Sequence, residues 1–149
     1  MSGGTALAVA ITAVAGLAGS VQVAIMSRLG ERIGIVEALA FATLLTAVLS
    51  FTVLLAARQS LAAYADGFRS PVWLWAAGLM GLIVIFSITY ATPRIGAAAT
   101  IGLLIAGQLA MGAVIDRFGL FGLERIPIGW TRVLGIALLA LGAGLSLKR

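Results

Sequence analysis

The sequence predicts an all-α transmembrane protein, a five-helix bundle that forms one domain over residues 1–149. Composition predicts this class, because 62% of the residues are hydrophobic and only 10% are charged. Soluble domains are about half apolar and about a quarter charged, so lipid is the expected solvent of this chain. The apolar runs are continuous and lack the alternation of a membrane β-barrel, which leaves helices as the spanning elements.

Each predicted span is an apolar run of about 20 residues, the length that crosses a bilayer. The five runs cover residues 5–27, 33–57, 72–92, 95–115 and 131–147. The first run is too long for a signal peptide and follows no basic residue, so we expect it to remain as a helix.

The breaks between the runs predict the connections. Residues 28–32 (Arg-Leu-Gly-Glu-Arg) predict a tight turn, and residues 58–71 predict a longer loop. Pro93-Arg94 leaves almost no loop, which predicts an antiparallel hairpin. Residues 116–130 are rich in glycine, and a bend is expected at residues 118–122.

Several functional classes are excluded by composition. The chain has no Cys and no His, which excludes disulfide scaffolds, the usual metal sites and catalysis by either residue. No nucleophile–base pair is visible, so we expect neither an enzyme nor a cofactor. The net charge is +5, but the ten basic residues are scattered between apolar runs and form no continuous stripe, so no nucleic-acid partner is expected.

The basic residues are balanced between the two membrane faces. Five spans place the termini on opposite faces, and the Lys/Arg count then sets the orientation. The face of the N-terminus carries Arg58, Arg69, Arg117, Arg125 and Arg132. The other face carries Arg28, Arg32, Arg94, Lys148 and Arg149. Either the chain inserts in both orientations and pairs with itself as an antiparallel homodimer, or deeply placed basic residues hide a bias that sets one orientation.

Glycine is abundant, with 19 residues that lie mostly inside the predicted spans. Small residues allow helices to approach closely in lipid, where no hydrophobic effect drives them together. The predicted packing glycines are Gly102, Gly107, Gly112 and Gly142. They pack either within the chain or across a dimer contact of the last two helices. The three tryptophans lie at the ends of spans and are expected to be interfacial anchors: Trp73, Trp75 and Trp130.

Strongly polar residues inside apolar runs are functional candidates. The predicted substrate-contacting residues are Gln22, Glu37 and Gln108. Glu37 is the only carboxylate inside a run, so it is also the candidate for proton coupling; the alternative is an interfacial Glu paired with Arg28 or Arg94. For each Gln, substrate contact and a hydrogen bond between helices both remain open.

Two further groups of polar residues carry expectations. Thr43, Thr46 and Ser50 share one helix face, and their hydroxyls either line a cavity or bond the backbone of their own helix. Asp116 ends the fourth span, where a carboxylate opposes the helix macrodipole. We therefore expect Asp116 to pair with Arg132 or Arg117.

Three motifs together resemble a known family. They are Thr92-Pro-Arg-Ile-Gly-Ala97, Ala106-Gly-Gln-Leu109 and Asp116-Arg-Phe-Gly-Leu-Phe-Gly122. With them the chain resembles the YdcZ-type small transporters of the drug/metabolite transporter superfamily, which are bacterial inner-membrane proteins with five predicted helices. The resemblance covers nearly the whole chain and is strongest in its second half.

The resemblance implies a secondary transporter or exporter of a small molecule, built from two inverted copies. The copies are a dual-topology homodimer, two inverted paralogues or a fused repeat. The matching family positions are Gln22, Pro93, Arg94, Gly96, Gln108 and Asp116, of which Pro93, Arg94 and Gly96 are expected to form a gate or hairpin. Ala24 and Met26 stand where the family commonly has Pro and then Asn.

The expected mechanism is alternating access in an antiparallel dimer, with the substrate cavity near the membrane midplane. A small ion channel formed by an inverted dimer is the first alternative, but it would need a continuous polar row that the sequence lacks. A membrane assembly partner without transport activity is the second alternative.

Overall fold

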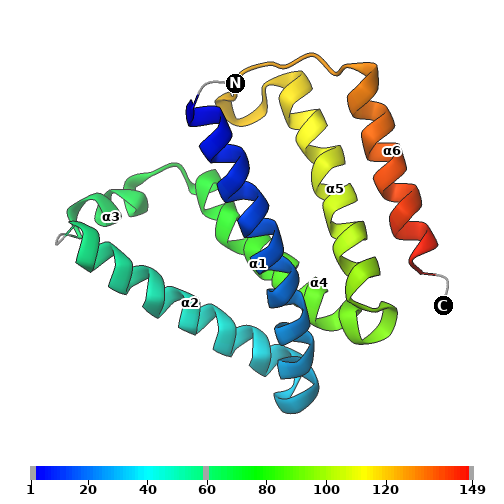
Figure 1. Cartoon of the computed structure of the whole chain (residues 1–149). Helices are drawn as coiled ribbons and strands as arrows, with labels where there is room; N and C mark the ends of the chain where they lie inside the picture. Colours follow the sequence, from blue (N-terminus) through cyan, green and yellow to red (C-terminus); the bar gives the residue numbers. More distant parts are fainter. Residues whose placement is uncertain (1–2, 59–60, 148–149) are drawn as a thin grey trace. The chain divides into compact units, whose positions relative to one another are not determined.

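The computed structural model describes residues 3–58 and 61–147, and its regular elements are all helical (Figure 1). The long helices are α1 (Gly3–Ile33), α2 (Ile35–Arg58), α4 (Ala76–Ile95), α5 (Ala97–Phe118) and α6 (Trp130–Leu145). Short elements complete the connections: α3 (Ala62–Asp66), η1 (Gly67–Arg69), η2 (Val72–Trp75) and η3 (Leu120–Gly122). Lys148 and Arg149, which entered the charge count, lie outside the described residues.

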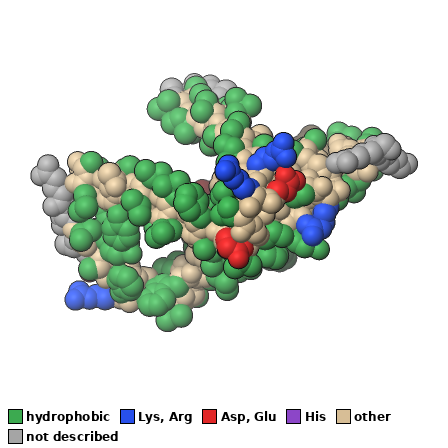
Figure 2. Space-filling view, turned by 90° about the horizontal axis from the view of Figure 1, so that it is seen from below, with side chains coloured by type: hydrophobic (Ala, Val, Ile, Leu, Met, Phe, Trp, Pro, Cys, Tyr) green, Lys and Arg blue, Asp and Glu red, His purple; other side chains and the backbone are tan. Residues whose placement is uncertain are grey.

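Four segments are long and apolar enough to cross a membrane, which confirms the all-helical membrane class. They are Gly4–Ile33, Ile35–Ala57, Val72–Ile95 and Ala97–Phe118. The fifth predicted span forms the shorter α6, whose 16 residues reach about 24 Å, against about 30 Å for a hydrocarbon core. Figure 2 shows hydrophobic side chains over much of the face it displays, with the few charged side chains in small groups.

The predicted turn at residues 28–32 is wrong, because α1 continues through it to Ile33. Arg, Leu and Glu are good helix formers, so polarity alone does not end the helix. Arg28 also donates a hydrogen bond to Glu31 at 3.1 Å, one turn along. The helix ends at Gly34, whose φ of +101° is readily adopted only by glycine. At 31 residues, α1 is about 46 Å long, so its polar end extends past the hydrocarbon core.

The third and fourth spans also end later than predicted. Pro93 and Arg94 form no loop, because α4 continues to Ile95 and contains Pro93. The break between α4 and α5 is a single residue, Gly96, whose φ of +83° ends the helix. The Gly96 N–H still donates to the Thr92 carbonyl at 2.9 Å, which closes the last turn of α4. Glycine geometry, rather than the polarity of Pro-Arg, therefore sets this boundary.

The chain divides into two compact units. The central unit is Ile25–Tyr90, and the terminal unit joins Met1–Ala24 to Ala91–Arg149. The central unit contains a close helix approach between Gly30 and Thr89, where a Cβ on Gly30 would lie 2.5 Å from the Thr89 methyl group. The prediction of a single domain over residues 1–149 stays a prediction.

In the terminal unit, α5 packs against α6 in an antiparallel pair (Figure 1). A Cβ on Gly102 would lie 2.9 Å from the Ala143 Cβ, so the two backbones approach closely there. Asp116 and Arg132 form an ion pair near the other end. These contacts lie 14 residues apart on α5, or about 21 Å. The α5–α6 pair is therefore held at two well-separated points.

The other predicted packing glycines lie away from this contact. A Cβ on Gly107, Gly112 or Gly142 would meet no atom within 4 Å among the residues described. These positions leave open strips on α5 and α6 that a facing helix could approach closely. Their role in packing stays a prediction.

Candidate functional site

The predicted substrate-contacting residues lie on three different helices. Gln22 is in α1 and Gln108 in α5, both in the terminal unit, whereas Glu37 is in α2 of the central unit. All three side chains are exposed. Among the residues that the structure describes, no hydrogen bond joins Gln22 to Gln108.

Gln108 lies at the middle of the 22-residue apolar helix α5. It shares a face with Gly112, one turn along, and this face is rotated by roughly 120° from Gly102, which contacts α6. Its amide bonds to no other described residue. An unpaired amide in hydrocarbon is costly. Gln108 is therefore placed to bond something outside the described chain, and both a substrate and a facing helix satisfy this requirement.

The junction of α4 and α5 holds a second unsatisfied polar group. The Thr92 hydroxyl is buried and bonds to no partner in the described part of the chain. Pro93 and Arg94 follow in the last turn of α4 and are exposed, and Thr100 donates to the Gly96 carbonyl at 2.8 Å. Buried hydroxyls are nearly always bonded, so the Thr92 hydroxyl is an exception among the described residues.

Most other hydroxyls inside the helices bond their own backbone. Thr43 donates to the Leu39 carbonyl at 2.8 Å and Thr46 to the Ala42 carbonyl at 2.9 Å. Of the two alternatives, lining a cavity or bonding the backbone of their own helix, the structure therefore has the second for Thr43 and Thr46. Nothing in the sequence separates Thr92 from these threonines, so sequence reasoning did not single it out.

Glu37 lies in the first turn of α2. Its carboxylate folds back and occupies the space where a side chain on Gly34 would begin. A negative charge there is stabilised by the positive end of the α2 dipole. The expected pair with Arg28 is not formed, because Arg28 pairs with Glu31. The geometry thus gives Glu37 a structural role at the start of α2, beside the coupling role that stays a prediction.

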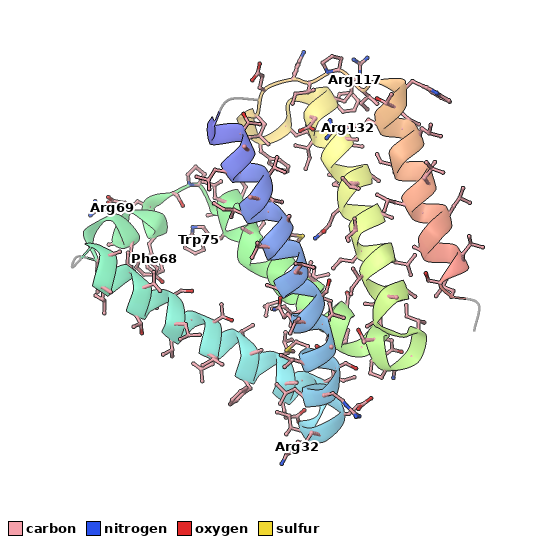
Figure 3. All side chains as sticks on the ribbon, viewed as in Figure 1. Arg32, Phe68, Arg69, Trp75, Arg117 and Arg132 are labelled. Carbon is pink, nitrogen blue, oxygen red and sulfur yellow. The ribbon has the colours of Figure 1, made fainter. Side chains whose placement is uncertain are left out.

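The end of α5 is joined to α6 by polar contacts. An Arg132 nitrogen donates to an Asp116 carboxylate oxygen at 2.5 Å, with 35% and 24% of the two side chains exposed. Of the two partners expected for Asp116, the structure has Arg132. The Ile126 N–H donates to the Asp116 carbonyl at 2.9 Å, which folds the connection back onto α5. Figure 3 shows Arg117 and Arg132 at this same end of the α5–α6 pair.

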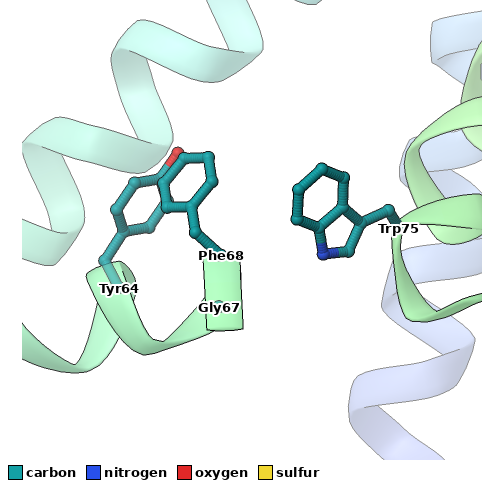
Figure 4. A pocket seen from close by; sticks show the side chains of 4 residues that line it. All are labelled: Tyr64, Gly67, Phe68 and Trp75. Atoms are coloured by element: carbon teal, nitrogen blue, oxygen red, sulfur yellow. The ribbon is translucent and has the colours of Figure 1, made fainter. Parts of the chain in front are cut away.

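An aromatic cavity of about 400 Å³ lies in the connection between α2 and α4 (Figure 4). It is lined by Tyr64, Gly67, Phe68 and Trp75. The Tyr64 and Phe68 rings meet edge to face at 5.6 Å and 81°, and the Phe68 and Trp75 rings at 6.1 Å and 87°. Aromatic faces suit apolar or cationic groups rather than anions. Sequence reasoning identified Trp75 only as an interfacial anchor and missed the other lining residues; the spacing of Tyr64 and Phe68, four residues apart, was the available signal.

Comparison with known proteins gives one family. A family profile described as "Putative inner membrane exporter, YdcZ" matches residues 7–145. The curated "Inner membrane protein YdcZ" of Escherichia coli (strain K12) is 28% identical over 145 residues, which are 96% of this chain and 96% of that protein. No solved structure matches the chain.

Proposed function

This chain belongs to the YdcZ family of inner-membrane exporters, and from this membership we propose that it is one subunit of a secondary transporter for a small molecule. Two subunits of opposite orientation form the transporter, as a dual-topology homodimer or with an inverted paralogue. The substrate cavity lies on the two-fold axis near the midplane, and α6 braces the dimer. The two subunits exchange conformations to give alternating access.

The observation that carries this proposal is the position of Gln108. An exposed amide at the middle of an apolar helix needs a polar partner, and the midplane is where transporters of this architecture bind substrate. Gly112 lies beside it on the same face and leaves room for a close approach. The buried Thr92 hydroxyl at the α4–α5 junction gives a second polar point in the same unit.

The balanced basic residues support the antiparallel arrangement. Five basic residues are assigned to each membrane face, so the Lys/Arg count favours neither orientation. Arg132 is ion-paired and only 35% exposed, which makes it the best candidate for a residue too deep to count. Removing it from the count shifts the bias by only one residue.

Two other functions compete with the carrier. An inverted-dimer channel would conduct far more than about 10³ ions per second, whereas a carrier needs a conformational change in the microsecond-to-second range for every cycle. Electrical recording of the reconstituted protein separates the two. A non-transporting assembly partner would give no flux of any compound. We expect proteoliposomes to show substrate-dependent flux without channel currents.

Replacing Gln108 with Ala is expected to weaken substrate binding more than dimer formation. The test starts by screening a panel of small cations, anions and neutral metabolites for counterflow in proteoliposomes containing the native chain. The binding constant of an active compound and the dimer fraction are then compared between the native chain and Gln108→Ala. Met111→Ala is the control, because it shortens another exposed side chain of α5 without removing an amide. A larger loss of dimer than of binding would make Gln108 a helix-packing residue.

Replacing Glu37 with Gln is expected to abolish transport driven by a pH gradient while the dimer still assembles. Gln cannot release a proton, and it keeps the size and the polar end of the side chain. The measurement is uptake of the same active compound with and without an imposed pH gradient. Glu31→Gln is the control, since that carboxylate already pairs with Arg28. If Glu37→Gln keeps the native response to the gradient, Glu37 has only a structural role at the start of α2.

A further inference from the structure

We propose that the cavity lined by Arg117, Phe118, Arg125 and Pro127 binds the phosphate group of an anionic phospholipid. The cavity has a volume of about 370 Å³ and lies where α5 gives way to the connection to α6. This volume is within the range of about 300–1,000 Å³ that small-molecule sites occupy. Lipid binding here is separate from the substrate cavity of the proposed transporter.

The fold brings the two arginines to the same cavity. Gly119 ends α5 with a φ of +62°, which turns the chain back. The Arg125 side chain then crosses Gly119 so closely that a Cβ on Gly119 would lie 2.7 Å from the Arg125 Cγ. The hydrogen bond from the Ile126 N–H to the Asp116 carbonyl, at 2.9 Å, fixes this return. Arg125 is therefore held beside the last turn of α5, which carries Arg117.

The local charges leave both guanidinium groups available to an anion. The carboxylate next to Arg117 in sequence is Asp116, and it is already engaged by Arg132. Neither Arg117 nor Arg125 forms an ion pair with any residue that the structure describes. Glu124 is exposed and is likewise unpaired among those residues. A guanidinium offers a planar set of donors that matches phosphate, and two of them in one cavity give a site for a single phosphate group.

The surroundings favour a lipid phosphate over a dissolved one. The cavity lies at the end of an apolar helix long enough to cross a membrane, which is the headgroup level. Exposed aromatic side chains occupy the same region, with Phe118 in the lining, Phe121 in the turn and Trp130 at the start of α6. Aromatic residues are typical of this level, and basic pockets there bind anionic headgroups. Phe118 and Pro127 give an apolar wall for the glycerol end of the lipid.

The test measures lipid affinity with the purified full chain in neutral detergent, from the rise in thermal midpoint as lipid is added. Phosphatidylglycerol is compared with zwitterionic phosphatidylcholine. We expect phosphatidylglycerol to bind more tightly, and Arg117→Gln/Arg125→Gln to weaken it by about 25-fold, or about fivefold per arginine. Arg28→Gln/Arg69→Gln is the matched control, because it removes two exposed charges that already pair with Glu31 and Asp66.

Four results would overturn the proposal. Equal affinity for the two lipids would show that the site does not distinguish an anionic headgroup from a zwitterionic one. Retention of the phosphatidylglycerol affinity in Arg117→Gln/Arg125→Gln, or the same loss in the control, would place the lipid elsewhere. Competition by inorganic phosphate as strong as that by the lipid would make this a site for a free anion.

A second variant keeps the test decisive if the Gln pair does not fold. Arg117→Lys/Arg125→Lys keeps both charges but loses the planar set of donors. We expect it to bind phosphatidylglycerol more weakly than the native chain but still in preference to phosphatidylcholine. If this variant binds phosphatidylglycerol as tightly as the native chain, the planar guanidinium groups do not contribute to binding. That result would contradict the proposed phosphate site.

Discussion

Replacing Gly102 with Val is expected to lower the stability of the α5–α6 pair by about 3 kcal/mol, because it overpacks a tight helix contact. Even the first atom of a side chain at Gly102 would lie 2.9 Å from the Ala143 Cβ and 3.2 Å from its Cα. The Cα belongs to the backbone of α6, which can yield only if the helix moves. A loss of this size corresponds to a drop of roughly 6–12 °C in the thermal midpoint, measured by tryptophan fluorescence in detergent.

Gly107→Val is the matched control for this substitution. It places the same side chain on the same helix, at a position where a Cβ meets nothing within 4 Å among the described residues. We expect its thermal midpoint to stay within a few degrees of the native value, while its dimer fraction falls if this open strip packs against another subunit. Equal drops in thermal midpoint for the two variants would contradict the packing of α5 on α6 through Gly102.

Replacing Arg132 with Gln is expected to cost about 2 kcal/mol, because it leaves the partly buried Asp116 carboxylate without its partner. That carboxylate also lies at the negative end of the α5 dipole. Once unpaired, its charge is therefore destabilised both by partial burial and by the helix dipole. The expected drop in thermal midpoint is roughly 4–8 °C, with the loss starting at the connection between α5 and α6.

A double-mutant cycle tests this ion pair directly. Asp116→Asn removes the carboxylate charge that Arg132→Gln leaves unpaired. The double variant Asp116→Asn/Arg132→Gln should therefore be more stable than Arg132→Gln alone. Arg69→Gln is the control, because Arg69 pairs with Asp66 at 3.5 Å but the two side chains are 86% and 70% exposed. Such a surface pair contributes about 0–1 kcal/mol. If Arg132→Gln costs no more than Arg69→Gln, the contact does not hold α5 to α6.

The helices themselves could be predicted because long, continuous apolar runs admit few other structures in lipid. Their ends could not be predicted equally well. Polar residues suggested a turn at residues 28–32 and a break between spans at Pro93-Arg94, yet both segments are helical. The actual breaks are at Gly34 and Gly96, where positive φ angles interrupt the helix. The sequence has 19 glycines, and only the backbone geometry shows which of them end a helix.

Some tertiary contacts and sites could be predicted from a local sequence rule, and others could not. The pairing of Asp116 could be expected from one local rule, the sign of the helix dipole, together with a nearby Arg. The contact of Gly30 with Thr89 joins residues far apart in sequence, so no local pattern indicated it. The cavity of Arg117 and Arg125 was missed for the same reason, since it depends on how the loop folds back. The predicted roles of Gln22, Glu37 and Gln108 stay predictions.

The most direct test of the antiparallel dimer is the topology of the chain in cells. Ser2 and Arg149 lie outside the described residues, and the chain has no Cys, so a single Cys at either end is a unique label. Intact cells that carry Ser2→Cys or Arg149→Cys are treated with a membrane-impermeant thiol reagent. Dual topology predicts that each terminus reacts in about half of the molecules. Complete reaction at one terminus and none at the other would show a single orientation and contradict the antiparallel homodimer.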